Sequence, residues 1–303
     1  MLLKDRSESD ELLILRYLNI RMELSEKEKF HYLNLEKGFQ GELIFDDMLA
    51  KDLQEERYII NDLLLEINNS YFQIDNLIIS QRVIHLLDVK YFNGDYYIKS
   101  DKLYAVATDR EYKNPVDQLK RCATLFRQLL QNLKQNYLVE SYVIFINPEF
   151  TLYQAPMDQP IIFPTQVNRF LKDLNQSSSK LDDGHLKLAK KLLSLHQPKN
   201  PYTKLPQYTY EQLQKGVYCY KCNSFLVSKH NYDLICRTCG GQEKIQLAVL
   251  RSVKEFKLLF PDRKITTQVI SDWCRIDLNR KTIFRVLKKH FKVFGNTSNT
   301  YFE

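Results

Sequence analysis

Two acidic residues and one lysine have the spacing and surroundings of a site for phosphate chemistry. Asp75 and Asp88 each interrupt an apolar stretch typical of a strand, and Lys90 follows Asp88 two positions later. Side chains two apart in a strand leave from the same face. If the two strands form a hairpin with a short loop around residue 81, Asp75 lies directly opposite Asp88. Opposed carboxylates repel each other, but a divalent cation would neutralise them, and oxygen ligands suit Mg²⁺ or Mn²⁺. We therefore predict Asp75 and Asp88 as metal ligands.

The lysine completes this chemistry. Hydrolysis of a phosphodiester needs a positioned water and stabilisation of the charge that builds on the phosphate, and a nearby ammonium group can orient or acidify that water. We assign this task to Lys90. The alternative for Asp75, Asp88 and Lys90 is an exposed sheet face with an ordinary cross-strand ion pair.

Two further residues could join the same site. Gly38 and Gly41 stand near an expected helix start, where glycine costs roughly 1 kcal/mol relative to alanine, so close approach of the helix to the sheet would explain them. Glu42 could then reach the metal. Gln118 lies in the first turn of a later helix, from which a side chain can point toward the sheet edge.

Four cysteines form a second candidate site. Cys219 and Cys222, then Cys236 and Cys239, make two C-x-x-C pairs separated by thirteen residues. This spacing offers four thiolates to a tetrahedral Zn²⁺ and is typical of a zinc ribbon. Because four protein ligands leave no open coordination position, we expect the zinc to be structural. Gly240 directly after the second pair allows the backbone to turn there.

The positive charge of the chain is concentrated in its last third. Residues 199–303 hold 19 Lys and Arg against 8 Asp and Glu, whereas the whole chain has a net charge of +7. Such a region is expected to bind a polyanion, most often a phosphate backbone.

The sequence pattern at the end of this basic region predicts two helices separated by a turn at residues 277–279. Two short strands follow, in the outline of a winged helix-turn-helix. The predicted nucleic-acid-binding residues are Arg280, Lys281, Arg285, Lys288 and Lys289. The alternative is a basic helical pair that touches no nucleic acid.

The elements that must position these residues follow from hydrophobic periodicity. Helices are expected over residues 9–37, 39–51, 165–175 and 184–196, and strands over 57–67, 71–80, 83–92, 96–106 and 138–146. Asn114 and Pro115 mark the start of one more helix, whose apolar stripe runs from Leu119 to Leu133. The order predicts an α/β fold with a mixed sheet flanked by helices.

The prolines at positions 198, 201 and 206 interrupt regular secondary structure and favour a domain boundary in this segment. We therefore expect a first domain over residues 1–196, a linker over 197–215, a zinc ribbon over 216–245 and a basic helical module over 246–303.

With these residues in hand, the first two thirds of the chain resembles the nuclease-related domain family, a branch of the restriction-endonuclease-like superfamily. The resemblance rests on Gly38 to Glu42, Ile74-Asp75, Asp88-Val89-Lys90 and Asn114-Pro115-Val116-Asp117-Gln118, in the order of the family pattern. It implies a restriction-endonuclease-like sheet with Asp75 and Asp88 as metal ligands, Lys90 as the catalytic lysine, and Glu42 and Gln118 as supporting residues. The family usually has Glu at the position of Asp88 and often His at that of Cys122.

Other features exclude some classes of protein. The chain has only 8 glycines, and none of the Gly-rich phosphate-binding motifs of dinucleotide or P-loop proteins is present. No apolar window is long enough to span a membrane, and the first residues lack the pattern of a secretory signal, so we expect a soluble, cytoplasmic protein without a membrane partner.

The sequence thus predicts a Mg²⁺- or Mn²⁺-dependent nuclease acting on DNA, with a zinc-braced basic module that binds nucleic acid. DNA rather than RNA follows from the resemblance alone, because basic charge does not distinguish the two. The alternative is a DNA-binding regulator or adaptor in which the nuclease fold serves as a scaffold without catalysis.

Overall fold

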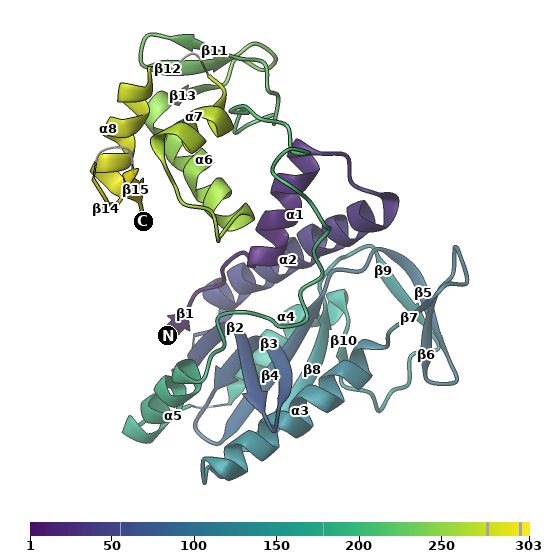
Figure 1. Cartoon of the computed structure of the whole chain (residues 1–303). Coiled ribbons are helices and arrows are strands. Elements are labelled where there is room, and N and C mark those ends of the chain that lie inside the picture. The colour runs from purple at the N-terminus through teal and green to yellow at the C-terminus, as the bar shows by residue number, and fades with distance from the viewer. Residues whose placement is uncertain (55, 178, 277–278, 297–298) are drawn as a thin grey trace. The chain divides into compact units, whose positions relative to one another are not determined.

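The computed structural model describes residues 1–54, 56–177, 179–276, 279–296 and 299–303. The chain divides into two compact units, each formed by two segments (Figure 1). Unit 1 contains Met1–Glu8 and Leu33–Thr203, and unit 2 contains Ser9–Tyr32 and Lys204–Glu303.

Unit 1 is built around a six-stranded mixed sheet with the order β1-β2-β3-β4-β8-β10. Its strands are β1 (Leu2–Lys4), β2 (Tyr58–Ile67), β3 (Ser70–Ile79), β4 (Val83–Lys90), β8 (Leu138–Phe145) and β10 (Ile161–Ile162). The central strands β2, β3 and β4 are antiparallel neighbours, whereas β8 runs parallel to β4. The predicted strands 57–67, 71–80, 83–92 and 138–146 all lie in this sheet, because their apolar residues can be buried on both faces.

Helices cover both faces of the sheet, as expected for a mixed α/β fold. On one face, α3 (Pro115–Asn132) and α5 (Asp183–Ser194) pack against the strands in one apolar core. On the other face, α2 (Glu26–Asp52) and α4 (Val167–Gln176), preceded by the 3₁₀ turn η1 (Pro164–Gln166), enclose a second core with Phe45 and Leu49. The start of α3 is capped as predicted, since the side chain of Asn114 accepts a hydrogen bond from the backbone of Val116 at 3.0 Å.

The strand expected over residues 96–106 is wrong. This segment forms a hairpin of β5 (Gly94–Lys99) and β6 (Lys102–Ala105), whose turn residues Ser100 and Asp101 have φ values of 50° and 61°. Two positive φ values match the twist that a two-residue hairpin turn requires. With β7 (Glu111–Tyr112) and β9 (Phe150–Tyr153), the hairpin makes a separate four-stranded sheet.

The break between the first two helices lies at residues 22–25, earlier in the chain than expected. The first helix, α1 (Asp10–Arg21), ends well before residue 37, and α2 then runs without interruption through Gly38 and Gly41. Ser25 caps the start of α2, because its backbone N–H donates to the carboxylate of Glu28 at 2.9 Å and its hydroxyl accepts from the N–H of Glu28 at 3.4 Å. This Ser-x-x-Glu capping box is a signal in the sequence that could have placed the break correctly.

Unit 2 contains the cysteine module and the basic helices. It has a three-stranded antiparallel sheet of β11 (Val227–His230), β12 (Asp233–Cys236) and β13 (Gln242–Lys244). Cys219 and Cys222 precede this sheet, Cys236 ends β12, and Cys239 lies between β12 and β13. The helices α6 (Ile245–Leu259), α7 (Thr267–Cys274) and α8 (Arg280–His290) follow, and then the hairpin of β14 (Val293–Phe294) and β15 (Tyr301–Phe302). Ile265 makes an isolated antiparallel β-bridge to Phe302, so the backbone just before α7 is joined to the hairpin. This order has the winged helix-turn-helix outline predicted. Of the turn expected at residues 277–279, residues 277 and 278 lie outside the described residues, and Asn279 caps α8.

The first helix belongs to unit 2, although the sequence suggested that residues 1–196 form one domain. Ile14, Leu18 and Leu24 are buried in the same core as α6, α7 and α8. Arg21 is fully buried there, and its guanidinium donates to Glu255 at 2.6 and 2.8 Å and lies 4.0 Å from the ring centre of Trp273. A buried arginine requires such partners, because an unpaired charge in the core is costly.

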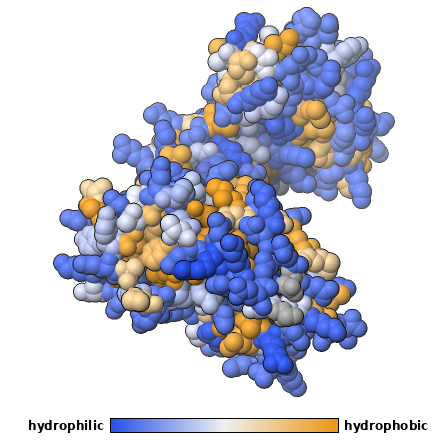
Figure 2. Space-filling view, turned by 180° about the vertical axis from the view of Figure 1, so that it is seen from behind, coloured by the Kyte–Doolittle hydropathy of each residue, from blue (hydrophilic) through white to orange (hydrophobic). Residues whose placement is uncertain are grey.

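Hydrophilic residues cover most of the face of each unit drawn in Figure 2. Among the described residues, no helix is both long enough and apolar enough to cross a membrane.

Candidate active site and candidate metal centre

The candidate active site lies where β3 and β4 separate. The ladder between them ends at the pair Asn76 and Leu87, with the register expected from the sequence, so Asp75 and Asp88 occupy the next position on each strand. Beyond this point the Oδ2 atom of Asp75 accepts a hydrogen bond from the backbone of Val89 at 2.9 Å. The carboxylate thus takes the place of a backbone partner, and both acids are buried, at 9% and 8% exposure.

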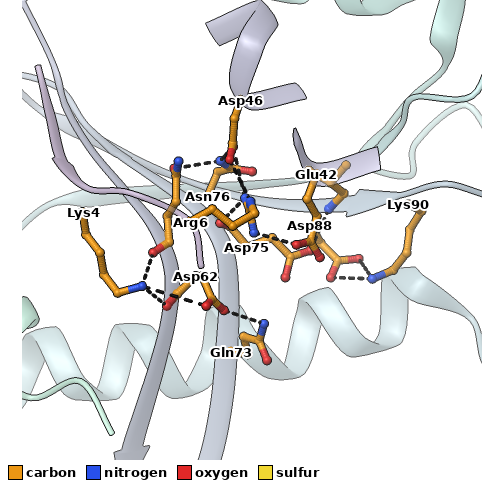
Figure 3. A network of polar contacts seen from close by, with 12 residues as sticks. Lys4, Arg6, Glu42, Asp46, Asp62, Gln73, Asp75, Asn76, Asp88 and Lys90 are labelled. Atoms are coloured by element: carbon orange, nitrogen blue, oxygen red, sulfur yellow. Dashed lines mark hydrogen bonds and ion pairs between the residues drawn. The ribbon is translucent and has the colours of Figure 1, made fainter. Parts of the chain in front are cut away.

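Asp88 and Lys90 leave β4 on the same face, as predicted from their spacing. The ammonium nitrogen of Lys90 lies 2.8 Å from each carboxylate oxygen of Asp88 (Figure 3). Burial, with the charge of Asp75 added, raises the pKa of Asp88 to about 6 even though Lys90 opposes this shift. Burial lowers the pKa of Lys90, but the charges of Asp88 and Asp75 outweigh it and leave that pKa above its ordinary value. Lys90 is therefore protonated at neutral pH and can donate hydrogen bonds.

Glu42 comes from α2 and is held by an arginine that the sequence analysis did not identify. The Nη1 atom of Arg6 donates to Oε2 of Glu42 at 2.7 Å, and its Nε and Nη2 atoms donate to the two oxygens of Asp46 at 2.7 and 3.1 Å (Figure 3). Burial and the charge of Asp75 raise the pKa of Glu42 to about 8, although Arg6 lowers it. Arg6 follows β1 and is separated from Glu42 by 36 positions, so no local pattern indicates the contact.

One of the two glycines before Glu42 allows the helix to approach the strand. A Cβ atom added at Gly41 would lie 2.6 Å from the Cβ atom of Tyr91, which follows β4. Gly38 has no neighbour within 4 Å of such an atom, so close approach explains Gly41 and does not explain Gly38. Because α2 can lie this close, Glu42, the next residue, is brought to the end of the sheet.

An unpredicted break in β2 adds another acid. Asp62 stands opposite Asp75 in the register of β2 and β3, but it has φ of 53° and makes no ladder pair there. The ammonium group of Lys4 bonds the carbonyl oxygens of Asn61 and Asp62 at 3.0 and 2.9 Å, and Gln73 donates to the Asp62 carboxylate at 2.9 Å. Residues in this sparsely populated backbone region often mark functional sites.

The charges of this network suit a divalent cation. Glu42, Asp46, Asp62, Asp75 and Asp88 supply five carboxyl groups, and Lys4, Arg6 and Lys90 supply three cations. When all five carboxyl groups are ionised, the excess of two negative charges in a largely buried region would be neutralised by one divalent ion. Within the described part of the chain, the carboxylate oxygens of Glu42, Asp75 and Asp88 do not all lie within 4.8 Å of one another, so a three-carboxylate site would require a shift of at least one of these side chains.

Gln118 and Cys122 lie on α3, one helical turn apart. Gln118 is exposed in the first turn of this helix, and in the described part of the chain it forms no hydrogen bond to Glu42, Asp75, Asp88 or Lys90. Cys122 is buried, and its thiol lies 3.4 Å from the carbonyl oxygen of Gln73. Burial and the charges of Asp88 and Asp75 raise the pKa of Cys122 to about 12, so this thiol stays protonated.

The four predicted cysteines form one cluster in unit 2. The Sγ atoms of Cys219, Cys222, Cys236 and Cys239 all lie within 4.8 Å of one another, with 3.6 Å between the first and last and 3.5 Å between the middle two. Such a cluster could hold zinc, as the spacing predicted.

The backbone around the thiols has the geometry of two similar knuckles. The N–H groups of Lys221 and Thr238 face the sulfurs of Cys219 and Cys236, both at 3.4 Å. After each second cysteine, Asn223 and Gly240 adopt φ values of 59° and 69°. Gly241, which the sequence analysis passed over, lies against two of the thiols, because a Cβ atom there would lie 3.2 Å from the sulfur of Cys219 and 3.3 Å from that of Cys239.

The basic residues predicted on the last helix are all exposed. Ile283, Val286 and Leu287 are buried on the inner face of α8, as expected from helical spacing. The outward side chains are those of Arg280, Lys281, Arg285, Lys288 and Lys289.

Comparison with known proteins gives one match. Residues 37–146 match the family described as nuclease-related domain, a segment that contains Glu42, Asp75, Asp88, Lys90 and Gln118. No curated protein and no solved structure matches the chain. The match indicates a nuclease-like function and agrees with the mixed sheet flanked by helices. Residues 37–146 of this chain are therefore similar to a nuclease-related domain.

Proposed function

We propose that the protein is a divalent-metal-dependent nuclease that hydrolyses phosphodiester bonds in DNA. The observation that carries the proposal is the convergence of Asp75, Asp88 and Lys90 at the point where β3 and β4 separate, within the nuclease-related domain. Asp75 and Asp88 would hold Mg²⁺ or Mn²⁺, with Glu42 as a further ligand. The excess of negative charge around them supports this assignment.

The residues of the site divide the chemistry between them. A bound divalent ion would supply charge stabilisation at the phosphate and polarise a water molecule. Lys90, protonated at neutral pH, cannot take a proton from water; it would orient the attacking water and stabilise negative charge that develops on a phosphate oxygen. Gln118, exposed at the start of α3, would orient the substrate or the water.

The C-terminal unit would hold the nucleic acid. Five exposed cationic side chains follow the outer face of α8, which is the second helix of the winged helix-turn-helix outline, and such a helix can enter a major groove. Zinc would be structural, because the four thiols leave no open coordination position. Free thiols of this kind persist in a reducing compartment, and we infer that the protein acts in the cytoplasm.

The Lys90→Ala variant tests the catalytic assignment. Purified protein with Mg²⁺ or Mn²⁺ is expected to nick DNA, and the variant should lose at least about a hundredfold in cleavage rate while its DNA affinity stays nearly unchanged. Lys99 is exposed on β5 of the same unit, so Lys99→Ala is the matched control and should cleave normally. Equal cleavage by Lys90→Ala and the unaltered protein would refute the assignment.

A second candidate is a DNA-binding adaptor that has kept the nuclease fold as a scaffold. Two observations favour it. The carboxylate oxygens of Glu42, Asp75 and Asp88 do not all lie within 4.8 Å of one another in the described part of the chain, and Lys90 already pairs with Asp88. For an adaptor, no metal would produce cleavage of linear, circular or single-stranded DNA or of RNA, whereas Arg285→Glu with Lys289→Glu would still abolish DNA binding.

A further inference from the structure

Arg6 has a place in the site that neither the family match nor its motifs provide. The matched segment begins at residue 37, and Arg6 comes from the short segment after β1, an edge strand that pairs with β2. Its side chain is 2% exposed, so it cannot touch a DNA substrate directly. An arginine buried to this degree must form ion pairs and hydrogen bonds with neighbouring groups of the protein.

The guanidinium joins the helix that carries Glu42 to the strand that carries Asp75. On the helix side it bonds Glu42 through Nη1 and holds Asp46, one turn later, through Nε and Nη2. On the strand side, Nη2 donates to the backbone carbonyl of Asp75 at 2.9 Å. The rigid fork of arginine suits this bridging, which a single ammonium group cannot reproduce.

Asp46 is itself fixed by the sheet. Asn76, adjacent to Asp75 on β3, donates through Nδ2 to Asp46 at 2.6 Å and to the side chain of Asn61 on β2 at 2.9 Å. Arg6, Asp46 and Asn76 therefore form a chain of hydrogen bonds from the N-terminal segment through α2 to the central strands (Figure 3). The chain sets where Glu42 stands relative to Asp75 and Asp88.

We propose that Arg6 is a positioning residue of the candidate metal site and acts by holding Glu42 in reach of a divalent ion bound at Asp75 and Asp88. The inference rests on the proposed metal site, but it does not require that the protein cleave DNA. Residues that orient metal ligands typically contribute 10- to 100-fold to metal affinity. If Arg6 acts through Glu42, removing either residue should have the same effect, and removing both should have no more.

A double-mutant cycle on Mn²⁺ affinity tests this. The full chain, loaded with zinc at its cysteines, is titrated with Mn²⁺ by calorimetry, together with Arg6→Gln, Glu42→Gln and the double variant. Each single variant is expected to weaken binding about tenfold, and the double variant also about tenfold rather than a hundredfold, because coupled residues are not additive. Asp88→Asn should abolish the binding event, which assigns the titration to this site.

Two controls separate positioning from folding. Arg82, exposed in the turn between β3 and β4, provides Arg82→Gln, which should bind Mn²⁺ normally. Arg6→Lys keeps the positive charge and most of the buried aliphatic part of the side chain, so we expect this variant to fold. It should still weaken Mn²⁺ binding, because one ammonium group cannot hydrogen-bond both Glu42 and Asp46 as the guanidinium does. Thermal unfolding of each variant shows whether it is folded.

Several outcomes would overturn the inference. Additive losses in the cycle would mean that Arg6 acts independently of Glu42. Tighter Mn²⁺ binding by Arg6→Gln would mean that Arg6 competes with the ion. Absence of Mn²⁺ binding in the unaltered protein would remove the inference and the metal site together. If the losses of Mn²⁺ affinity are not additive but the protein does not cleave DNA, the role of Arg6 is supported and only the proposed nuclease activity is contradicted. If the protein cleaves DNA but the losses are additive, only the role of Arg6 is contradicted.

Discussion

The protonation of two carboxyl groups connects the candidate site to pH. Burial is the main cause that raises the pKa of Asp88 to about 6 and that of Glu42 to about 8, and the charge of Asp75 adds to both shifts. A protonated carboxyl is a poor metal ligand, so metal binding must displace these protons. Because both pKa values are higher in the folded than in the unfolded chain, protonation of these carboxyl groups stabilises the folded, metal-free protein. This contribution to the free energy of unfolding is lost as the pH rises through about 6 for Asp88 and about 8 for Glu42.

From these shifts we expect Mn²⁺ affinity to rise between pH 5 and pH 8.5. The increase should begin near pH 6, as Asp88 loses its proton, and continue toward pH 8, as Glu42 does. Calorimetric titrations at a series of pH values measure this dependence, and Glu42→Gln should remove the upper part of the increase. An affinity that stays constant across the range would show that neither carboxyl binds the ion.

At the scale of elements, the contact between α2 and the end of β4 is tight at one glycine and open at the other. Gly41→Ala would place a Cβ atom 2.6 Å from that of Tyr91, so the helix would have to move away from the sheet, at a cost of about 1–3 kcal/mol in unfolding free energy. Gly38→Ala meets no neighbour within 4 Å and should stabilise the helix by up to about 1 kcal/mol. Chemical denaturation of the two variants measures both effects; equal effects of the same sign would contradict this view of α2.

The cysteine module offers a second prediction for an element. Cys236→Ser should release zinc and lower the unfolding temperature of unit 2 while unit 1 stays folded, because a small ribbon of three short strands depends on its metal. Metal analysis and thermal unfolding monitor the two effects. Cys122→Ala, which changes a buried thiol of unit 1 outside the cluster, is the control and should keep its zinc. One full equivalent of zinc in Cys236→Ser would argue against a four-thiolate site.

At the scale of the whole molecule, the C-terminal unit depends on a helix from the other end of the chain. Arg21 of α1 forms a fully buried ion pair with Glu255 of α6 and also donates to the carbonyl oxygens of Gln214 and Gly216, at 2.6 and 3.2 Å. Together with Ile14 and Leu18, it ties α1 into the core of unit 2. We infer that the zinc and basic modules fold with residues 9–32 as one unit.

Loss of this ion pair should destabilise unit 2 strongly. Arg21→Ala leaves the Glu255 carboxylate buried without its partner, and breaking a buried pair in this way typically costs about 3–5 kcal/mol. Arg21→Met with Glu255→Met removes both charges and should recover a large part of the loss. Zinc release during chemical denaturation of the full chain reports on this unit. A single variant as stable as the unaltered protein would contradict the dependence of unit 2 on α1.

The sequence by itself determined the features that depend on neighbours along the chain. A short turn around residue 81 fixed the pairing that brings Asp75 opposite Asp88, because the length of a hairpin loop sets the register of its two strands. The start of α3 at Asn114 and the cysteine cluster followed from local capping and spacing. The course of α2 was also written locally, in the capping box at Ser25, although periodicity alone did not reveal it.

Only the tertiary structure decided which distant segments complete each unit. Arg6 reaches Glu42 across 36 positions, and Arg21 reaches Glu255 across 234. Neither arginine carries a local signal, because a buried cation is distinguished from a solvated one only by the partners that folding brings to it. The assignment of α1 to the C-terminal unit has the same cause: an amphipathic helix shows in its sequence that one face will be buried, but not against which core.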